Sequence, residues 1–139
     1  MQTPSRDKIK RIFRKRKHLK IPKEFDSIDF SNLNYYSWYD PNDHGIYMLF
    51  EYNNVLDGIA WDTTFFSQGD TRLGRCEICK KVVELRDIVL ITAKTRFKRK
   101  GVIYIARGNY VCVHYKECNK EMKNGEGLEK LIQAILEDN

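Results

Sequence analysis

The sequence predicts an α+β fold, and three observations carry this prediction. Residues 31–66 are dense in aromatic and β-branched residues and contain two turn signals, a pattern typical of an antiparallel meander. Four cysteines occur as two pairs in the second half, which indicates a metal-stabilised region. A basic stretch near the N-terminus and an apolar stripe near the C-terminus predict a helix at each end. We expect two parts, residues 1–70 and 71–139, that form one compact unit overall.

The N-terminal helix is predicted from residue 6 to about residue 17, with Ser5 as its N-cap. Its apolar residues have the spacing i, i+3 and i+4 and form a narrow stripe on a cationic helix: Ile9, Ile12 and Phe13. Pro22 is expected to end this segment, because proline cannot continue a helix.

The meander is predicted to follow, with turns at residues 40–45 and 53–58. Its aromatic side chains could stack on nucleic-acid bases, or they could form a core: Tyr35, Tyr36, Trp38, Tyr47, Phe50 and Trp61. No Lys or Arg occurs between residues 24 and 71, so a phosphate-binding face is not expected there. We therefore interpret these aromatics as core residues.

The second half is predicted to contain a strand centred on residues 88–91 and apolar stretches at 102–105 and 110–113. A cationic turn at residues 98–101 lies just before the last two stretches. The chain closes with a predicted helix whose apolar residues recur at i, i+3, i+4, i+7 and i+8: Leu128, Leu131, Ile132, Ile135 and Leu136.

The net charge of +6 is distributed unevenly along the 139 residues. Residues 6–23 carry ten Lys or Arg and one Asp, and residues 24–71 carry nine Asp or Glu. Residues 72–139 carry fifteen basic and nine acidic residues. The acidic middle excludes a uniformly basic surface. The N-terminal basic block could be an arm for nucleic acid, or it could lie along the acidic meander, and we favour the second interpretation.

Several classes of protein are not expected from this sequence. No run approaches the roughly 18 to 20 apolar residues that a membrane-spanning helix needs. The N-terminus is charged from Arg6 onward and lacks the apolar core of a secretory signal, so a cytoplasmic location is expected. Disulfides are uncommon in that compartment, and the cysteines need another role. No phosphate-binding loop or nucleophile elbow is present, so an enzyme is not predicted.

The four cysteines are interpreted as ligands of one structural Zn²⁺ ion. Cys76 and Cys79 form a C-x2-C knuckle, which suits two corners of a zinc tetrahedron with bonds of about 2.3 Å. Cys112 and Cys118 follow at a predicted strand-to-helix junction, which makes a treble-clef arrangement. Free buried thiols and a redox pair are the alternatives, and His114 could replace one ligand. Four sulfur ligands would leave no position for a reactive water.

The segments around the last two cysteines carry a specific pattern, Arg107-Gly108-Asn109-Tyr110-Val111-Cys112 followed by Cys118-Asn119-Lys120. This pattern resembles the FusB-type fusidic acid resistance proteins. A second match lies in residues 5–22, which are similar to the basic helix that opens the family's C-terminal lobe. The resemblance covers nearly all of the chain. It departs from the full-length proteins in one respect, because the chain has no room for the helical-bundle domain that precedes this lobe.

The resemblance implies a treble-clef zinc-finger protein that binds elongation factor G and promotes its release from the ribosome. We expect a non-catalytic monomer. Contact with the ribosome or its RNA would be indirect. Residue by residue, the family's basic and aromatic contact residues match Arg107 and Tyr110. The family's aromatic on the final helix corresponds to the region of Leu128 and Leu131.

A cationic loop before this motif is a further candidate for partner binding: Lys94, Arg96, Lys98, Arg99 and Lys100. The loop could contact an acidic protein face or ribosomal RNA, or it could be a solvated hairpin tip. An alternative function from another class is a zinc-ribbon-like ribosomal or RNA-binding protein that uses both basic blocks on phosphates.

Overall fold

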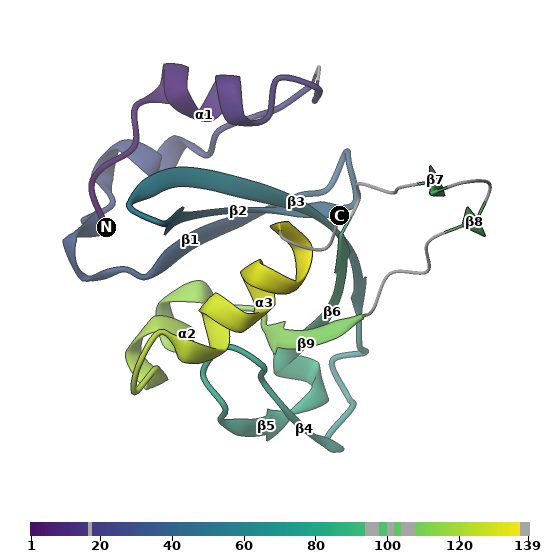
Figure 1. Ribbon diagram of the computed structural model, residues 1–139. Helices are drawn as coiled ribbons and strands as arrows, with labels where there is room; N and C mark the ends of the chain where they lie inside the picture. The colour runs from purple at the N-terminus through teal and green to yellow at the C-terminus, as the bar shows by residue number, and fades with distance from the viewer. Residues whose placement is uncertain (17, 94–97, 100–101, 104–107, 137–139) are drawn as a thin grey trace. The chain divides into compact units, whose positions relative to one another are not determined.

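The computed structural model (Figure 1) describes residues 1–16, 18–93, 98–99, 102–103 and 108–136. By its internal contacts the chain divides into a first unit, Met1–Ala60, and a second unit, Trp61–Asn139. Both combine helical segments with antiparallel strands, so the predicted α+β class is confirmed. The boundary that composition suggests, after residue 70, stays a prediction. None of the helices within the described ranges is long and apolar enough to cross a membrane.

The first unit contains one α-helix, two 3₁₀ turns and an antiparallel meander, in the order α1 (Arg6–Ile12), η1 (Lys23–Ser27), η2 (Phe30–Asn32), β1 (Tyr35–Asp40), β2 (Gly45–Tyr52) and the first part of β3 (Val55–Phe65). Strand β1 pairs with β2 from Tyr35 opposite Phe50 to Asp40 opposite Gly45. The three predicted strands of the meander are therefore confirmed.

Helix α1 begins as predicted and ends earlier than predicted. The Ser5 hydroxyl accepts a hydrogen bond from the Lys8 backbone N–H at 3.1 Å, which confirms the N-cap. The helix ends at Ile12, and Phe13 leaves the helical conformation at φ −102° and ψ 31°. The prediction of an end near residue 17 was wrong, because Phe13 leaves the helix to pack against Trp38 and Tyr47 of the later strands. Pro22 instead precedes η1.

The second turn of the meander is shorter than predicted. Asn53 and Asn54 have φ values of 52° and 63°, and two positive values are what a two-residue hairpin turn of type I′ requires. Strand β3 begins at Val55, so Gly58 lies within the strand and not in the turn. A Cβ at Gly58 would stand 2.5 Å from the ring of Phe13, so this glycine leaves space for a packed side chain.

The aromatic residues of the meander lie in the interior. Phe13 contacts Trp38 and Tyr47 edge to face, with ring centroids 6.2 and 5.0 Å apart. The six aromatics that could have stacked on bases are all buried: Tyr35, Tyr36, Trp38, Tyr47, Phe50 and Trp61. Their interpretation as core residues is confirmed, and these six side chains are not available for stacking on bases.

The second unit begins within β3 and continues with the elements β4 (Leu73–Arg75), β5 (Val82–Glu84), η3 (Leu85–Asp87), β6 (Ile88–Ala93), β7 (Lys98–Arg99), β8 (Val102–Ile103), β9 (Asn109–Cys112), α2 (Tyr115–Glu121) and α3 (Glu126–Leu136). Strand β6 lies between the end of β3 and β9 and pairs antiparallel with both. The predicted strand at 88–91 and the predicted closing helix are both confirmed.

Candidate metal centre

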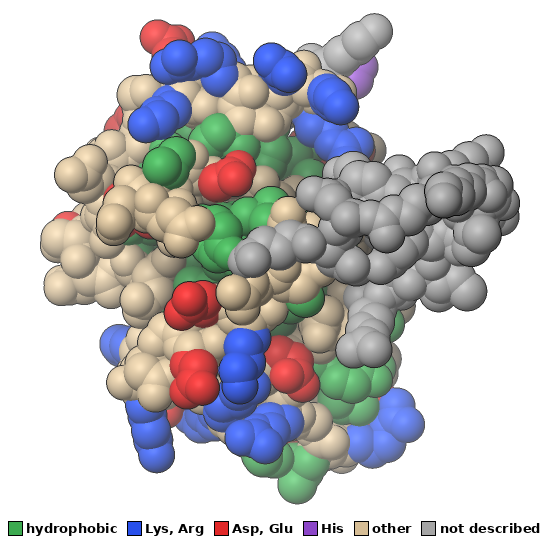
Figure 2. Space-filling view, in the orientation of Figure 1, with side chains coloured by type: hydrophobic (Ala, Val, Ile, Leu, Met, Phe, Trp, Pro, Cys, Tyr) green, Lys and Arg blue, Asp and Glu red, His purple; other side chains and the backbone are tan. Residues whose placement is uncertain are grey.

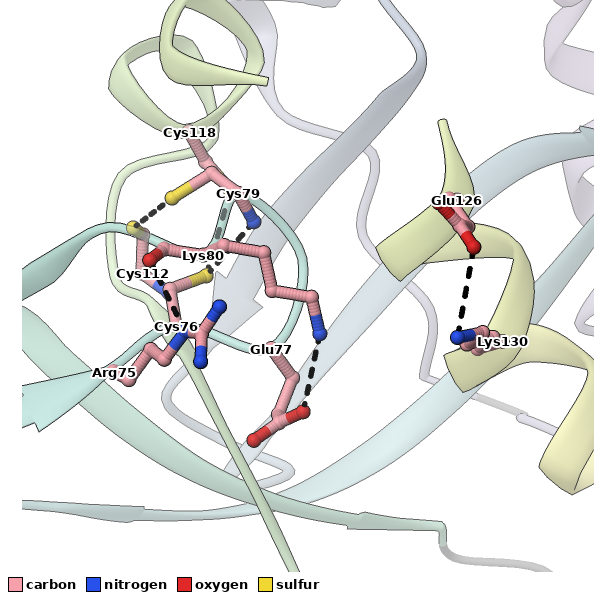
Figure 3. A network of polar contacts seen from close by, with 9 residues as sticks. All are labelled: Arg75, Cys76, Glu77, Cys79, Lys80, Cys112, Cys118, Glu126 and Lys130. Atoms are coloured by element: carbon pink, nitrogen blue, oxygen red, sulfur yellow. Dashed lines mark hydrogen bonds and ion pairs between the residues drawn. The ribbon is translucent and has the colours of Figure 1, made fainter. Parts of the chain in front are cut away.

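The four cysteines of the sequence meet at one point in the second unit. Their Sγ atoms all lie within 4.8 Å of one another, and they face one another in Figure 3. The Sγ atoms of Cys76 and Cys118 are 3.7 Å apart, and so are those of Cys79 and Cys112. A zinc tetrahedron with bonds of about 2.3 Å has sulfur-to-sulfur edges of about 3.8 Å, so these residues fit one zinc ion.

The first two ligands lie in a tight knuckle between β4 and β5. The Cys76 N–H donates to the Lys81 carbonyl at 3.0 Å, and the Lys80 N–H donates to the Cys76 carbonyl at 2.9 Å. Lys80 has a φ of 67°, which turns the chain back toward β5. The Cys79 N–H points at the Cys76 Sγ at 3.5 Å. The Arg75 guanidinium donates to the Lys80 carbonyl at 3.2 Å and closes the turn (Figure 3).

The other two ligands come from the last strand and the helix that follows it. Cys112 is the final residue of β9, and Cys118 is buried on α2. Two hydrogen bonds join β9 to the knuckle: the Glu77 N–H donates to the Tyr110 carbonyl at 2.8 Å, and the Cys112 N–H donates to the Cys76 Sγ at 3.4 Å. A knuckle, a strand and a helix thus supply the ligands in treble-clef order.

Because the sulfur atoms lie close together, the pKa values of two of the thiols shift in opposite directions. Hydrogen bonds from the thiols of Cys112 and Cys118, helped by the backbone N–H groups of Cys79 and Cys112, lower the pKa of Cys76 to about 2. Hydrogen bonding to Cys118 and Cys76 raises the pKa of Cys112. Zinc would supply the positive charge that ionises the ligands when it binds.

The structure decides between the alternatives for the fourth ligand. His114 is exposed at the N-cap of α2, and in the described part of the chain the group of possible metal ligands consists of the four cysteines alone. The alternative in which His114 replaces one of the cysteine ligands is therefore wrong. Four thiolates complete a tetrahedral zinc shell, so the centre is suited to a structural role.

Of the residues proposed for partner binding, Tyr110 is the one whose side chain is described and exposed. It is 41% exposed, and its ring packs near Phe66 with centroids 5.9 Å apart. Leu128 and Leu131 are buried at 6% and 5% exposure, so the structure does not support them as surface contacts. Phe66 was not predicted, because the sequence marks it only as the end of an aromatic run.

The remaining candidates lie wholly or partly outside the described residues. Lys94, Arg96, Lys100 and Arg107 are not described. The backbone of Lys98 and Arg99 forms β7, which pairs with β8, and their side chains are not described. Partner binding through these residues stays a prediction.

Comparison with known proteins agrees with the centre's geometry. The sequence model of the FBP C-terminal treble-clef zinc-finger family matches residues 9–133. The solved structure of the fusidic acid resistance protein FusC superposes with a TM-score of 0.77 at 25% sequence identity. The match covers 95% of this chain and 58% of FusC, so the chain spans little more than half the length of that protein. No curated protein matches the sequence.

Proposed function

Because the chain belongs to the FBP C-terminal treble-clef zinc-finger family, we propose that it is a non-catalytic protein that binds elongation factor G. We further propose that binding promotes release of the factor from the ribosome. FusC, which has a similar structure, is a fusidic acid resistance protein. The motif around Tyr110 and Cys112 resembles that of proteins that bind this factor.

The observation that carries the proposal is the way Tyr110 is held beside the metal centre. Its carbonyl accepts the hydrogen bond from the zinc knuckle at Glu77, and its backbone pairs with Leu90 in β6. Its ring has Phe66 as a neighbour and remains 41% exposed. An aromatic side chain fixed in this way loses little conformational freedom on binding and is a typical interface anchor.

The chemistry of the centre supports binding in preference to catalysis. All four cysteines are placed to hold one ion, and three of them are buried. Such a shell offers no open position at which zinc could activate water. The metal would instead hold the knuckle, β9 and α2 together, so that Tyr110 is presented on a rigid support.

A calorimetric titration with purified elongation factor G tests the proposal. Tyr110→Ala should weaken binding by about tenfold or more, equivalent to about 1.4 kcal/mol, while the zinc content stays unchanged. Tyr39→Ala is the matched control, because Tyr39 is also 41% exposed and belongs to the first unit. Combining Tyr110→Ala with Arg107→Glu should weaken binding further. Wild-type affinity in the Tyr110 variant would contradict the proposed contact.

A further inference from the structure

A set of exposed cations lies on and after α1 in the first unit, and we call it the α1 basic surface. Its members are all exposed and positively charged: Lys8, Lys10, Arg11, Arg14, Lys15 and Lys20. Figure 2 shows Lys and Arg side chains gathered over α1. The candidate contacts for elongation factor G belong to the second unit, so this surface is not used by the proposed function.

The α1 basic surface is not neutralised within the first unit. Arg6 forms an ion pair with Asp26 at 2.8 Å, the one such link between the basic block and the acidic segment in the described part of the chain. The six members of the surface make no side-chain hydrogen bond or ion pair among the described residues. The N-terminal segment does pack on the meander, through Phe13 against Trp38 and Tyr47. Its charges are not neutralised there, because the ion pair of Arg6 is with Asp26 in η1.

The acidic side chains of the first unit have local partners instead. Asp29 accepts a hydrogen bond from the Ser31 N–H at 3.0 Å, and Asp40 accepts one from the Asn42 N–H at 2.9 Å. Asp43 accepts a hydrogen bond from the Tyr47 hydroxyl at 2.5 Å. Asp29 thus caps η2, and Asp40 and Asp43 stabilise the first turn of the meander. The cations on α1 are consequently available to an external anion.

The apolar face of α1 is already used in the fold. Ile9 is fully buried and Phe13 is 5% exposed, and Phe13 packs against Trp38 and Tyr47. A helix that binds in a membrane interface inserts an apolar face, and the centre of a protein interface is usually apolar as well. The α1 basic surface offers neither an exposed apolar face for a membrane nor an apolar centre for a protein interface. Cationic donors without exposed aromatic neighbours suit contacts to phosphate groups, which fix position without reading bases.

We propose that the α1 basic surface binds the phosphate backbone of RNA without sequence preference. The phosphate contact rests on the exposed, unpaired cations. The choice of RNA rests on the proposed function, which brings the chain to the ribosome. Lys8 and Arg11 are three residues apart on α1 and therefore lie on adjacent turns of one helix face, so several phosphates can be contacted together.

Fluorescence anisotropy with a labelled RNA hairpin, measured from about 50 to about 200 mM salt, tests the proposal. Affinity should fall linearly in log–log form, with a slope of about −0.9 for each duplex phosphate contacted. The triple variant K10Q/R11Q/R14Q should flatten that slope by about 3 and keep the wild-type thermal midpoint, since its three side chains are exposed.

The control K116Q/K120Q/K123Q removes three exposed charges from the second unit and should leave the slope unchanged. Equal losses in the two triple variants would overturn the assignment to α1. A DNA hairpin of the same sequence should bind comparably, because contacts to phosphates alone do not read the 2′-hydroxyl. Stronger binding to anionic phospholipid vesicles would overturn the proposal. A titration of elongation factor G into K10Q/R11Q/R14Q separates the two proposals, because that binding should be retained whether or not RNA binding is lost.

Discussion

Gly127 of α3 lies directly against Ile78 of the zinc knuckle. A Cβ atom at position 127 would stand 2.5 Å from the carbonyl oxygen of Ile78 and equally close to that of Glu77. The first turn of α3 therefore rests on the backbone between the first two zinc ligands. This contact couples the closing helix to the metal centre, because Glu77 and Ile78 lie between the ligands Cys76 and Cys79.

Gly127→Ala is expected to destabilise the protein by about 1 to 3 kcal/mol, the usual cost of overpacking an interior. The loss should appear even though alanine is favoured over glycine within helices by about 1 kcal/mol. Urea unfolding measures the difference. Gly125→Ala is the matched control, because nothing lies within 4 Å of a Cβ placed there. Similar stability of the two variants would show that the knuckle moves aside easily.

Removal of the metal should unfold the second unit. Cys118→Ser should lower the zinc content from one ion per chain toward zero, because Cys118 is a buried ligand whose Sγ lies 3.7 Å from that of Cys76. Structural zinc in small domains is bound with about 10 to 16 kcal/mol, so its loss should abolish cooperative unfolding of this unit. Metal analysis and circular dichroism measure both effects. His114→Ala should retain the ion, and a fold that survives chelation would argue against a structural zinc.

Features encoded by local chemistry could be predicted from the sequence. The spacing of Cys76 and Cys79 fits a zinc knuckle in any surrounding, and Ser5 caps a helix through a hydrogen bond three residues away. The closing helix follows from apolar periodicity alone. Each of these depends on residues close together in the chain, so the correct interpretation needed no knowledge of tertiary contacts.

Features set by tertiary packing could not be predicted in the same way. The end of α1 depends on the burial of Phe13 against Trp38 and Tyr47, which come from two later strands. Gly58 looked like a turn residue because glycine is common in turns, and its actual role is to leave space for Phe13. Likewise, the sequence alone does not show whether Leu128 is buried in the core or exposed on a binding face.

Gly58→Ala should destabilise the first unit by about 1 to 3 kcal/mol. The new methyl group would stand 2.5 Å from the Phe13 ring and 3.0 Å from the Met48 carbonyl oxygen. Gly69→Ala should be nearly neutral, because a Cβ there meets nothing within 4 Å. A double-mutant cycle with Phe13→Leu tests the cause, since the smaller side chain should recover part of the lost stability. If the stability losses of Gly58→Ala and Phe13→Leu are additive, the strain does not arise from the contact between position 58 and Phe13.

The ion pair between Asp70 and Arg72 should make stability depend on pH in acid. The Arg72 guanidinium donates to both carboxylate oxygens of Asp70, at 3.0 and 2.7 Å, and holds the pKa of Asp70 below its ordinary value of 3.8. A lowered folded-state pKa means that the unfolded chain binds the proton more readily. The stabilisation is therefore complete above the unfolded pKa and is lost as the pH falls through the folded one.

Asp70→Asn should accordingly be slightly less stable than the wild type near neutral pH, and the difference should shrink as the pH falls below about 4. The effect should be small, because the Arg72 side chain is 75% exposed and water screens the pair. Urea unfolding at a series of pH values measures it. Arg72→Gln should remove the same acid-dependent part, and adding Asp70→Asn to that variant should change little. If the free energies of unfolding of Asp70→Asn and the wild type instead differ by a constant amount down to low pH, Asp70 does not act through its charge. It would then act through backbone contacts, such as the hydrogen bond from the Arg86 N–H to the Asp70 carbonyl at 3.1 Å.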